Sequence, residues 1–79
     1  MPVRVRYFAR MAEIAGCAEE IIAPVPATAA ALFVHLSERH RFGFDAAALR
    51  VAINDQFVGW ESVLHDGDEV ALIPPVSGG

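Results

Sequence analysis

The segment that most restricts the fold is the stretch D-E-V-A-L-I-P-P-V-S-G-G, from Asp68 to Gly79. Residues Glu69 to Ile73 alternate between polar or small residues and apolar ones, a pattern that predicts a β-strand. The pair Pro74-Pro75 ends that strand, because neither proline has a backbone N–H to donate to a neighbouring strand. The residues that follow carry too little side chain to pack, so we expect residues 76–79 to project as a free tail.

The tail Val76-Ser77-Gly78-Gly79 supports two interpretations. In the first it is an inert terminus, because glycines at chain ends are tolerated at no cost. In the second, Gly78, Ser77 and Val76 thread a narrow channel in another protein and deliver the carboxylate of Gly79 to a buried site. The tail alone leaves both open.

The rest of the sequence supplies strand and helix signals in an ordered series. Alternating apolar residues predict strands over Met1–Phe8, Glu19–Pro24, Arg50–Asn54 and Phe57–Gly59. Apolar residues at helical spacing predict one main helix over Ala29–His40, with Thr28 as its N-cap and Gly43 as its stop. Short helical turns are predicted over Ala9–Ala15, which ends at Gly16, and within Phe44–Leu49.

This order of elements predicts an α+β fold, a mixed five-stranded sheet packed on one main helix with short additional helical turns. If the first and last strands are parallel neighbours at the centre, the arrangement is the β-grasp, or ubiquitin-like, fold. The chain is 54% apolar, which favours a globular domain over a disordered segment. We predict a single domain over residues 1–75.

One face of the predicted sheet points away from the helix and carries both charged and apolar residues. The residues expected on it are Arg4, Arg6, Phe8, Arg50, Ala52, Glu69, Ala71 and Ile73. The arginines and Glu69 can pair across strands. Phe8 and Ile73, together with Phe57, would instead form an apolar patch beside the root of the tail. Such patches mark binding sites, so we predict that this patch, with Pro74 and Pro75, binds a protein partner.

Charge and composition exclude several functional classes. The net charge of −4 disfavours nucleic-acid binding and suits a basic protein partner. No apolar run is long enough to cross a membrane, and the N-terminus does not resemble a signal peptide. The single cysteine, Cys17, expected to be half-buried, permits no internal disulfide, which fits a reducing, cytoplasmic location. All six basic residues are arginines, so no side-chain amine is available.

No constellation for self-contained catalysis is found. His35, His40 and His65 are too scattered to predict a metal site, and each is expected on the surface. There is no Ser-His-Asp arrangement and no glycine-rich phosphate loop. We therefore predict no metal, no permanently bound cofactor and no active site within the chain itself.

Three segments together resemble the MoaD/ThiS family of ubiquitin-like sulfur carriers, and within it the small subunits of molybdopterin synthase. They are D-G-D-E-V-A-L-I-P-P-V-S-G-G (Asp66–Gly79), V-R-Y-F-A-R-M-A-E-I-A-G (Val5–Gly16) and R-V-A-I-N-D-Q-F-V (Arg50–Val58). The resemblance covers nearly the whole chain and implies the β-grasp fold. It also places Phe8, Phe57 and Ile73 at family contact positions. The family's arginine in the first helix is replaced here by Ala12.

The resemblance implies a function for the tail. An E1-like enzyme uses ATP to adenylate the Gly79 carboxylate, and a sulfur donor protein converts the adenylate to a thiocarboxylate. The carrier then docks in the large catalytic subunit of a heterotetrameric molybdopterin synthase and donates sulfur to cyclic pyranopterin monophosphate. Two such transfers form the dithiolene that holds molybdenum. The chain would thus be a subunit and a consumed co-substrate.

Three alternatives remain open at this point. One is a sulfur carrier of another pathway, chiefly thiamine synthesis, although those chains usually lack a helix equivalent to Ala9–Ala15. Another is a ubiquitin-like modifier that is conjugated to lysines. The third is a β-grasp interaction module with an inert terminus.

Overall fold

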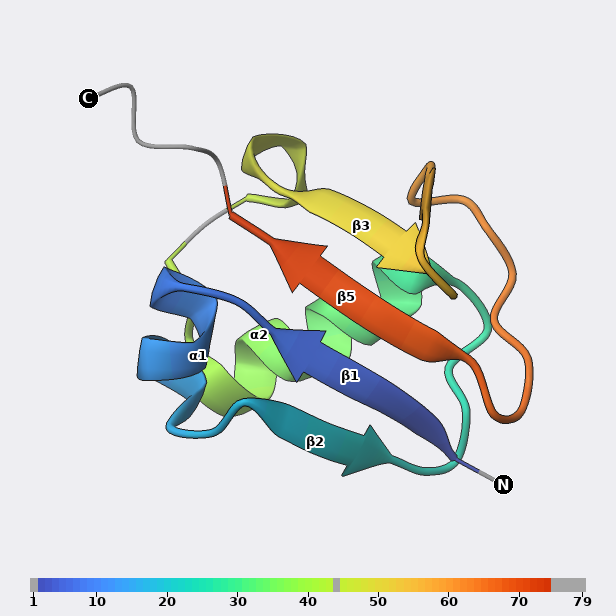
Figure 1. The fold of residues 1–79 in the computed structure, drawn as a ribbon, viewed down its shortest axis with the longest axis horizontal. Helices are drawn as coiled ribbons and strands as arrows, with labels where there is room; N and C mark the ends of the chain where they lie inside the picture. Colours follow the sequence, from blue (N-terminus) through green and yellow to red (C-terminus); the bar gives the residue numbers. More distant parts are fainter. Residues whose placement is uncertain (1, 44, 75–79) are drawn as a thin grey trace.

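The computed structural model describes residues 2–43 and 45–74 (Figure 1). Its elements, in chain order, are β1 (Val3–Tyr7), α1 (Arg10–Ala15), β2 (Glu19–Ile22), α2 (Ala29–His40), the 3-10 turn η1 (Ala46–Ala48), β3 (Arg50–Ile53), β4 (Gln56–Val58) and β5 (Glu69–Ile73). The predicted order of strands and helices is confirmed.

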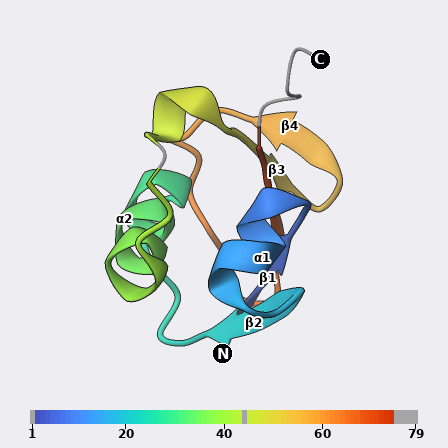
Figure 2. The ribbon, with the colours of Figure 1, turned by 90° about the vertical axis from the view of Figure 1, so that its left-hand side faces the viewer.

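The strands form one sheet in the order β2-β1-β5-β3-β4. The central pair, β1 and β5, is parallel, whereas the other three pairs are antiparallel. Helix α2 covers one face of the sheet, and α1 lies at the end toward which β1 and β5 run (Figures 1 and 2). A parallel first and last strand at the centre of such a sheet defines the β-grasp fold, so the predicted α+β fold class is confirmed.

The core lies between the sheet and α2. Val5 of β1, with Val70 and Leu72 of β5, is fully buried against the helix layer, where Leu32 and Leu36 of α2 are also fully buried. Each such side chain contributes about 1.5–3 kcal/mol through removal of its apolar surface from water. Because alternate residues of the two central strands carry this burial, their register is fixed by the core.

Helix α2 begins and ends at the predicted residues, Ala29 and His40, but the residue that stops it differs from the prediction. The hydroxyl oxygen of Thr28 accepts a hydrogen bond from the Ala31 N–H at 3.1 Å, which confirms the N-cap. The expected stop at Gly43 is wrong, because Arg41 already adopts a left-handed conformation with φ 55° and donates its N–H to the Ser37 carbonyl. This turn brings Phe42, 4% exposed, back into the core.

The boundaries of β1, β2, β3 and β4 also differ from the prediction, by one or two residues. Strand β2 ends at Ile22 rather than at Pro24. Strand β4 begins at Gln56, because Asn54 and Asp55 form the turn by themselves, with φ of 51° and 71°. The Asn54 side chain accepts from the Glu69 N–H at 3.0 Å and donates to the Asp68 carboxylate at 3.0 Å. This turn is therefore tied to the start of β5.

The chain reverses at Gly67 before β5 begins. Gly67 takes φ 85°, the left-handed conformation that glycine adopts without strain. At the other helical element, Gly16 takes φ 76° and donates its N–H to the Ala12 carbonyl at 2.9 Å, which ends α1 as expected.

One burial prediction is wrong, and one residue is more buried than its predicted position suggests. Cys17 is exposed rather than half-buried, because it lies in the turn between α1 and β2. Ala52 lies, as predicted, on the open face, which is the face of the sheet that points away from α2. It is nevertheless only 7% exposed. Its methyl group is short and stands between Phe57 of β4 and Ala71 of β5, so its neighbours cover it. Neither helix in the described part of the chain is long and apolar enough to cross a bilayer.

Candidate functional site

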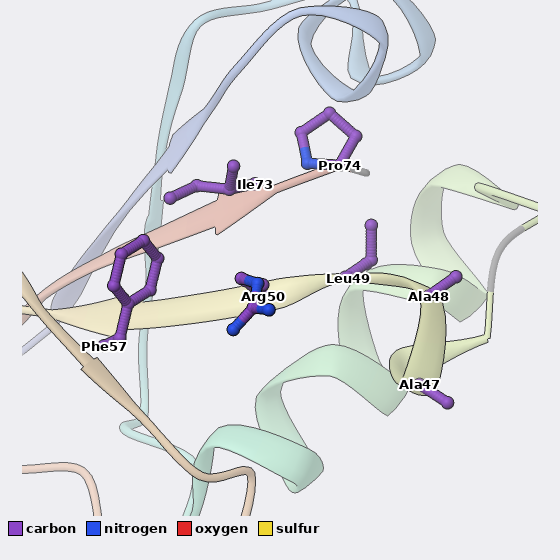
Figure 3. Close-up of a pocket in the computed structure, with 7 residues that line it drawn as sticks. All are labelled: Ala47, Ala48, Leu49, Arg50, Phe57, Ile73 and Pro74. Atoms are coloured by element: carbon purple, nitrogen blue, oxygen red, sulfur yellow. The ribbon is translucent and has the colours of Figure 1, made fainter. Parts of the chain in front are cut away.

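A groove of about 700 Å³ opens where β5 ends (Figure 3). It is lined by Ala47, Ala48, Leu49, Arg50, Phe57, Ile73 and Pro74. The groove therefore joins three consecutive features of the fold: the end of β5, the start of β3 with the preceding turn η1, and the edge strand β4. It lies at the root of the C-terminal segment.

The sheet register brings the apolar members of the groove together. Ile73 is paired with Arg50 of β3, and one row further along the sheet Ala71, Ala52 and Phe57 lie side by side. The side chains of Ala52 and Ala71 are too short to cover the Phe57 ring. Because β4 is also an edge strand, Phe57 remains 66% exposed, the highest value among the large apolar residues that are exposed in the described structure.

Arg50 distinguishes the groove electrostatically. Its guanidinium lies over the Phe57 ring, with Cζ 6.0 Å from the ring centroid. The predicted pairing of outward arginines with Glu69 holds for Arg4 at 3.9 Å and Arg6 at 4.0 Å. It is wrong for Arg50, which contacts no carboxylate among the residues that the structure describes. Among the described residues, the groove thus presents a cation that no carboxylate pairs, within apolar surroundings.

The remaining members of the predicted patch divide into two groups. Phe8 is 39% exposed, and the Arg6 guanidinium lies 5.4 Å from its ring centroid. It follows Tyr7, which pairs with Leu72, so it lies next to Ile73 on the neighbouring strand without lining the groove. Pro74 is half-buried and lines the groove. Pro75, Val76, Ser77, Gly78 and Gly79 lie outside the described residues.

A second polar cluster lies on the helix side of the sheet. Oε1 of Glu20 accepts hydrogen bonds from the Tyr7 hydroxyl at 2.6 Å and from Nε2 of His40 at 2.7 Å. Its Oε2 lies 2.6 Å from Nε of Arg39. The His40 side chain is only 13% exposed, so the expectation that every histidine lies on the surface is wrong for this one. The cluster joins β1 and β2 to the end of α2.

Burial and hydrogen bonding shift two pKa values in this cluster. Burial, reinforced by the hydrogen bond to the Glu20 carboxylate and by its charge, raises the pKa of Tyr7 far above its ordinary range. Burial alone would raise the pKa of Glu20. The hydrogen bonds from Tyr7 and His40 and the nearby cations outweigh burial and hold that pKa below its ordinary value. Glu20 is therefore a partly buried anion held by three donors.

Metal chemistry finds no support in the described part of the chain, where no group of three or more His, Cys, Asp or Glu side chains lies close enough to hold a metal. The arrangement at the groove can bind a protein surface. Sequence reasoning identified Phe57, Ile73 and Pro74 and missed the contributions of Ala47, Ala48 and Leu49. The signal for Arg50 was present, since strand alternation placed it outward beside Ile73.

Known proteins share this fold. The sequence pattern of the ThiS family matches residues 5–79. The chain belongs to the ThiS family. Within this family, it is 38% identical over 81 residues to the molybdopterin synthase sulfur carrier subunit of Escherichia coli, covering 98% of this chain and 99% of that protein.

Solved structures related to this ThiS-family chain share its fold. Small archaeal modifier protein 1 of Haloferax volcanii superposes with a TM-score of 0.84 at 27% identity, covering 100% of both chains. A chain from the protein–protein complex of subunits 1 and 2 of the molybdopterin-converting factor of Helicobacter pylori also superposes. Its TM-score is 0.71 at 29% identity, over 100% of both chains. The likeness therefore extends to a protein solved with a partner subunit.

Proposed function

We propose that this chain is the sulfur carrier small subunit of a molybdopterin synthase. The observation that carries the proposal is its 38% identity, over 98% of its length, to a protein of that name. The groove at the end of β5 supports it, because a carrier needs a docking surface beside the segment that carries the cargo. The pathway implied is molybdenum cofactor biosynthesis.

The chemistry proceeds at the carboxylate of Gly79. An E1-like enzyme brings ATP, and a carboxylate oxygen attacks the α-phosphate with loss of pyrophosphate. The acyl-adenylate now has a good leaving group, so sulfur at the oxidation level of sulfide, supplied by a donor protein, displaces AMP and leaves a thiocarboxylate. The thiocarboxylate, anionic and nucleophilic as a thiolate is, attacks the cyclic pterin phosphate precursor. Hydrolysis of the acyl group returns the carboxylate.

The described domain provides the surface that would place the tail in a partner's active site. Phe57, Ile73 and Pro74 provide the apolar docking surface, and Phe8 extends it along β1. We assign this surface to the large catalytic subunit and to the E1-like enzyme, which would use it in turn. Apolar anchors of this kind dominate binding when they enter a pocket of the partner. ATP is bound by the activating enzyme, and this chain needs no resident cofactor.

Mass spectrometry of the intact chain tests the proposal. The purified chain is incubated with an E1-like enzyme, a sulfur donor protein and ATP. We expect the mass gain of one oxygen-to-sulfur exchange, located on the C-terminal peptide. The modified chain, mixed with the large subunit and the pterin precursor, should then return to its original mass as the dithiolene product forms. A chain whose mass never changes contradicts the proposal.

A second function, a ubiquitin-like protein modifier, is favoured by one observation. This is the superposition on small archaeal modifier protein 1, with a TM-score of 0.84. The same experiment separates the two functions, because a modifier forms an isopeptide bond with a lysine of another protein. This chain contains no lysine. The lysine of every such conjugate would therefore belong to a protein other than this one.

A further inference from the structure

Arg50 is the exception among the charged residues on the open face of the sheet. The strands place three arginines on this face, Arg4, Arg6 and Arg50, together with two glutamates, Glu19 and Glu69. Arg4 approaches both glutamates, at 3.7 and 3.9 Å, and Arg6 approaches Glu69 at 4.0 Å. Both carboxylates are thus satisfied by the β1 arginines, and the fold leaves Arg50 without one in the described region.

The surroundings of Arg50 are apolar on both sides. The Phe57 ring lies on one side of the guanidinium, at 6.0 Å, and Ile73 is its direct partner across the β3–β5 pair. Figure 3 shows the Arg50 side chain between Phe57 and the residues of η1, within the groove. A partner that covers this groove removes water from the guanidinium. A buried and unpaired cation is costly, so a well-fitting partner has to supply an anion at this point.

The charge of the open face differs in sign from the net charge of the whole chain. The open face carries three positive against two negative side chains in the strands, whereas the whole chain carries a net charge of −4. Long-range attraction therefore favours a basic partner, while the groove itself selects an acidic group within it. Arginine is suited to that selection, because its planar fork binds a carboxylate through two parallel hydrogen bonds.

We propose that Arg50 is a specificity-determining contact, which binds an Asp or Glu side chain of the large catalytic subunit when that carboxylate is flanked by apolar residues that cover Phe57 and Ile73. The proposal rests on the proposed function, which supplies the partner. It goes beyond that function by naming the chemistry on the partner's side of the groove. The apolar contacts hold the partner, and the ion pair sets its register.

Binding of the large subunit to three variants tests the proposal by titration calorimetry at low and at high salt. Arg50→Gln removes the charge, Arg50→Lys keeps the charge without the fork, and Arg41→Gln is the matched control. Arg41, like Arg50, is exposed and has no carboxylate partner among the described residues, but it ends α2 on the other side of the sheet. We expect Arg50→Gln to raise Kd at least about tenfold, Arg50→Lys to raise it less, and Arg41→Gln to change it by less than about twofold.

The carboxylate is identified by neutralising the acidic residues of the large subunit one at a time. One of them should raise Kd for the wild-type carrier and have no further effect on Arg50→Gln, which is the mark of a direct pair. Equal Kd values for Arg50→Gln and wild type, or additive effects for every acidic residue, would overturn the proposal while leaving the proposed function intact. A wild-type chain that does not bind the large subunit would overturn both.

Discussion

Glu20→Gln tests whether the partly buried polar cluster of Tyr7, Glu20 and His40 stabilises the fold by charge. Tyr7 and His40 both donate to Oε1 of Glu20, so an amide oxygen can replace that acceptor without a change in size. Hydrogen bonds to charged groups contribute about 1.5–3 kcal/mol, and neutral ones about 0.5–1.5 kcal/mol. Two such losses amount to about 2 kcal/mol. The Arg39 side chain is 58% exposed, so its pair adds at most about 1 kcal/mol.

We therefore expect Glu20→Gln to lower the free energy of unfolding by about 2–3 kcal/mol, and Tm by at least about 8 °C for a domain of this size. Urea titrations and thermal melts at pH 7 measure both quantities. Glu19→Gln is the matched control, because Glu19 is adjacent and exposed and its contact with Arg4 is 3.7 Å long. That variant should differ from wild type by less than about 0.5 kcal/mol.

The pH dependence gives a second readout of the same substitution. The pKa of Glu20 is lower in the folded state than its ordinary value of 4.5. Its stabilisation is therefore complete above about pH 4.5 and is lost as the pH falls further, through the folded-state pKa. The difference between wild type and Glu20→Gln should shrink over that window. A difference below about 0.5 kcal/mol at pH 7, or one that stays constant down to pH 3, would show that the charge of Glu20 is not what the cluster needs.

Four further changes probe the site and the core. Deleting Gly79, or adding one residue after it, should abolish thiocarboxylate formation in the mass-spectrometric assay without changing Tm, and product from an untrimmed extended chain would contradict this. Gly78→Val should preserve the fold and slow adenylation or sulfur transfer, whereas wild-type rates in both half-reactions would show that steric fit is not selected. Phe57→Ala should weaken binding of the large subunit or the E1-like enzyme by at least about 1 kcal/mol, while Val34→Ala, at another exposed apolar residue on α2, should not. Leu72→Ala, at a fully buried core position, should cost about 2–5 kcal/mol in urea unfolding, and a loss below about 1 kcal/mol would mean that the core does not fix β5.

Much of the fold follows from local rules that the sequence displays. Alternation located the central strands, because one face of each packs on α2 and the other does not. Thr28 fixed the start of α2 through a single side-chain hydrogen bond. The capping residue of α2 was harder to predict, since Arg41 adopts a left-handed conformation that its residue type does not favour. The chain turns at Arg41 so that Phe42 enters the tertiary core, and local sequence does not display that core.

The polar cluster around Glu20 and the groove were likewise predictable in part from local patterns and in part not. Glu20 precedes the buried Ile22 by two residues, and His40 follows Leu36 by four, so each lies on an inward-facing row. Those spacings could have predicted that both side chains face the layer between sheet and helix, and the expectation of surface histidines ignored them. The groove could be predicted only in part. Its β5 and β4 residues follow from alternation, but the place of η1 beside them is set by packing.

The position of the groove explains how a small domain can present a C-terminal segment with precision. Strand β5 is hydrogen-bonded on both sides, to β1 and to β3. Leu72 is fully buried in the core, and the next two residues, Ile73 and Pro74, line the groove. A slip of one residue in β5 would expose Leu72, so the core holds the groove and the root of the tail in one register. Docking then needs no binding free energy to fix where the tail begins, because folding has already fixed it.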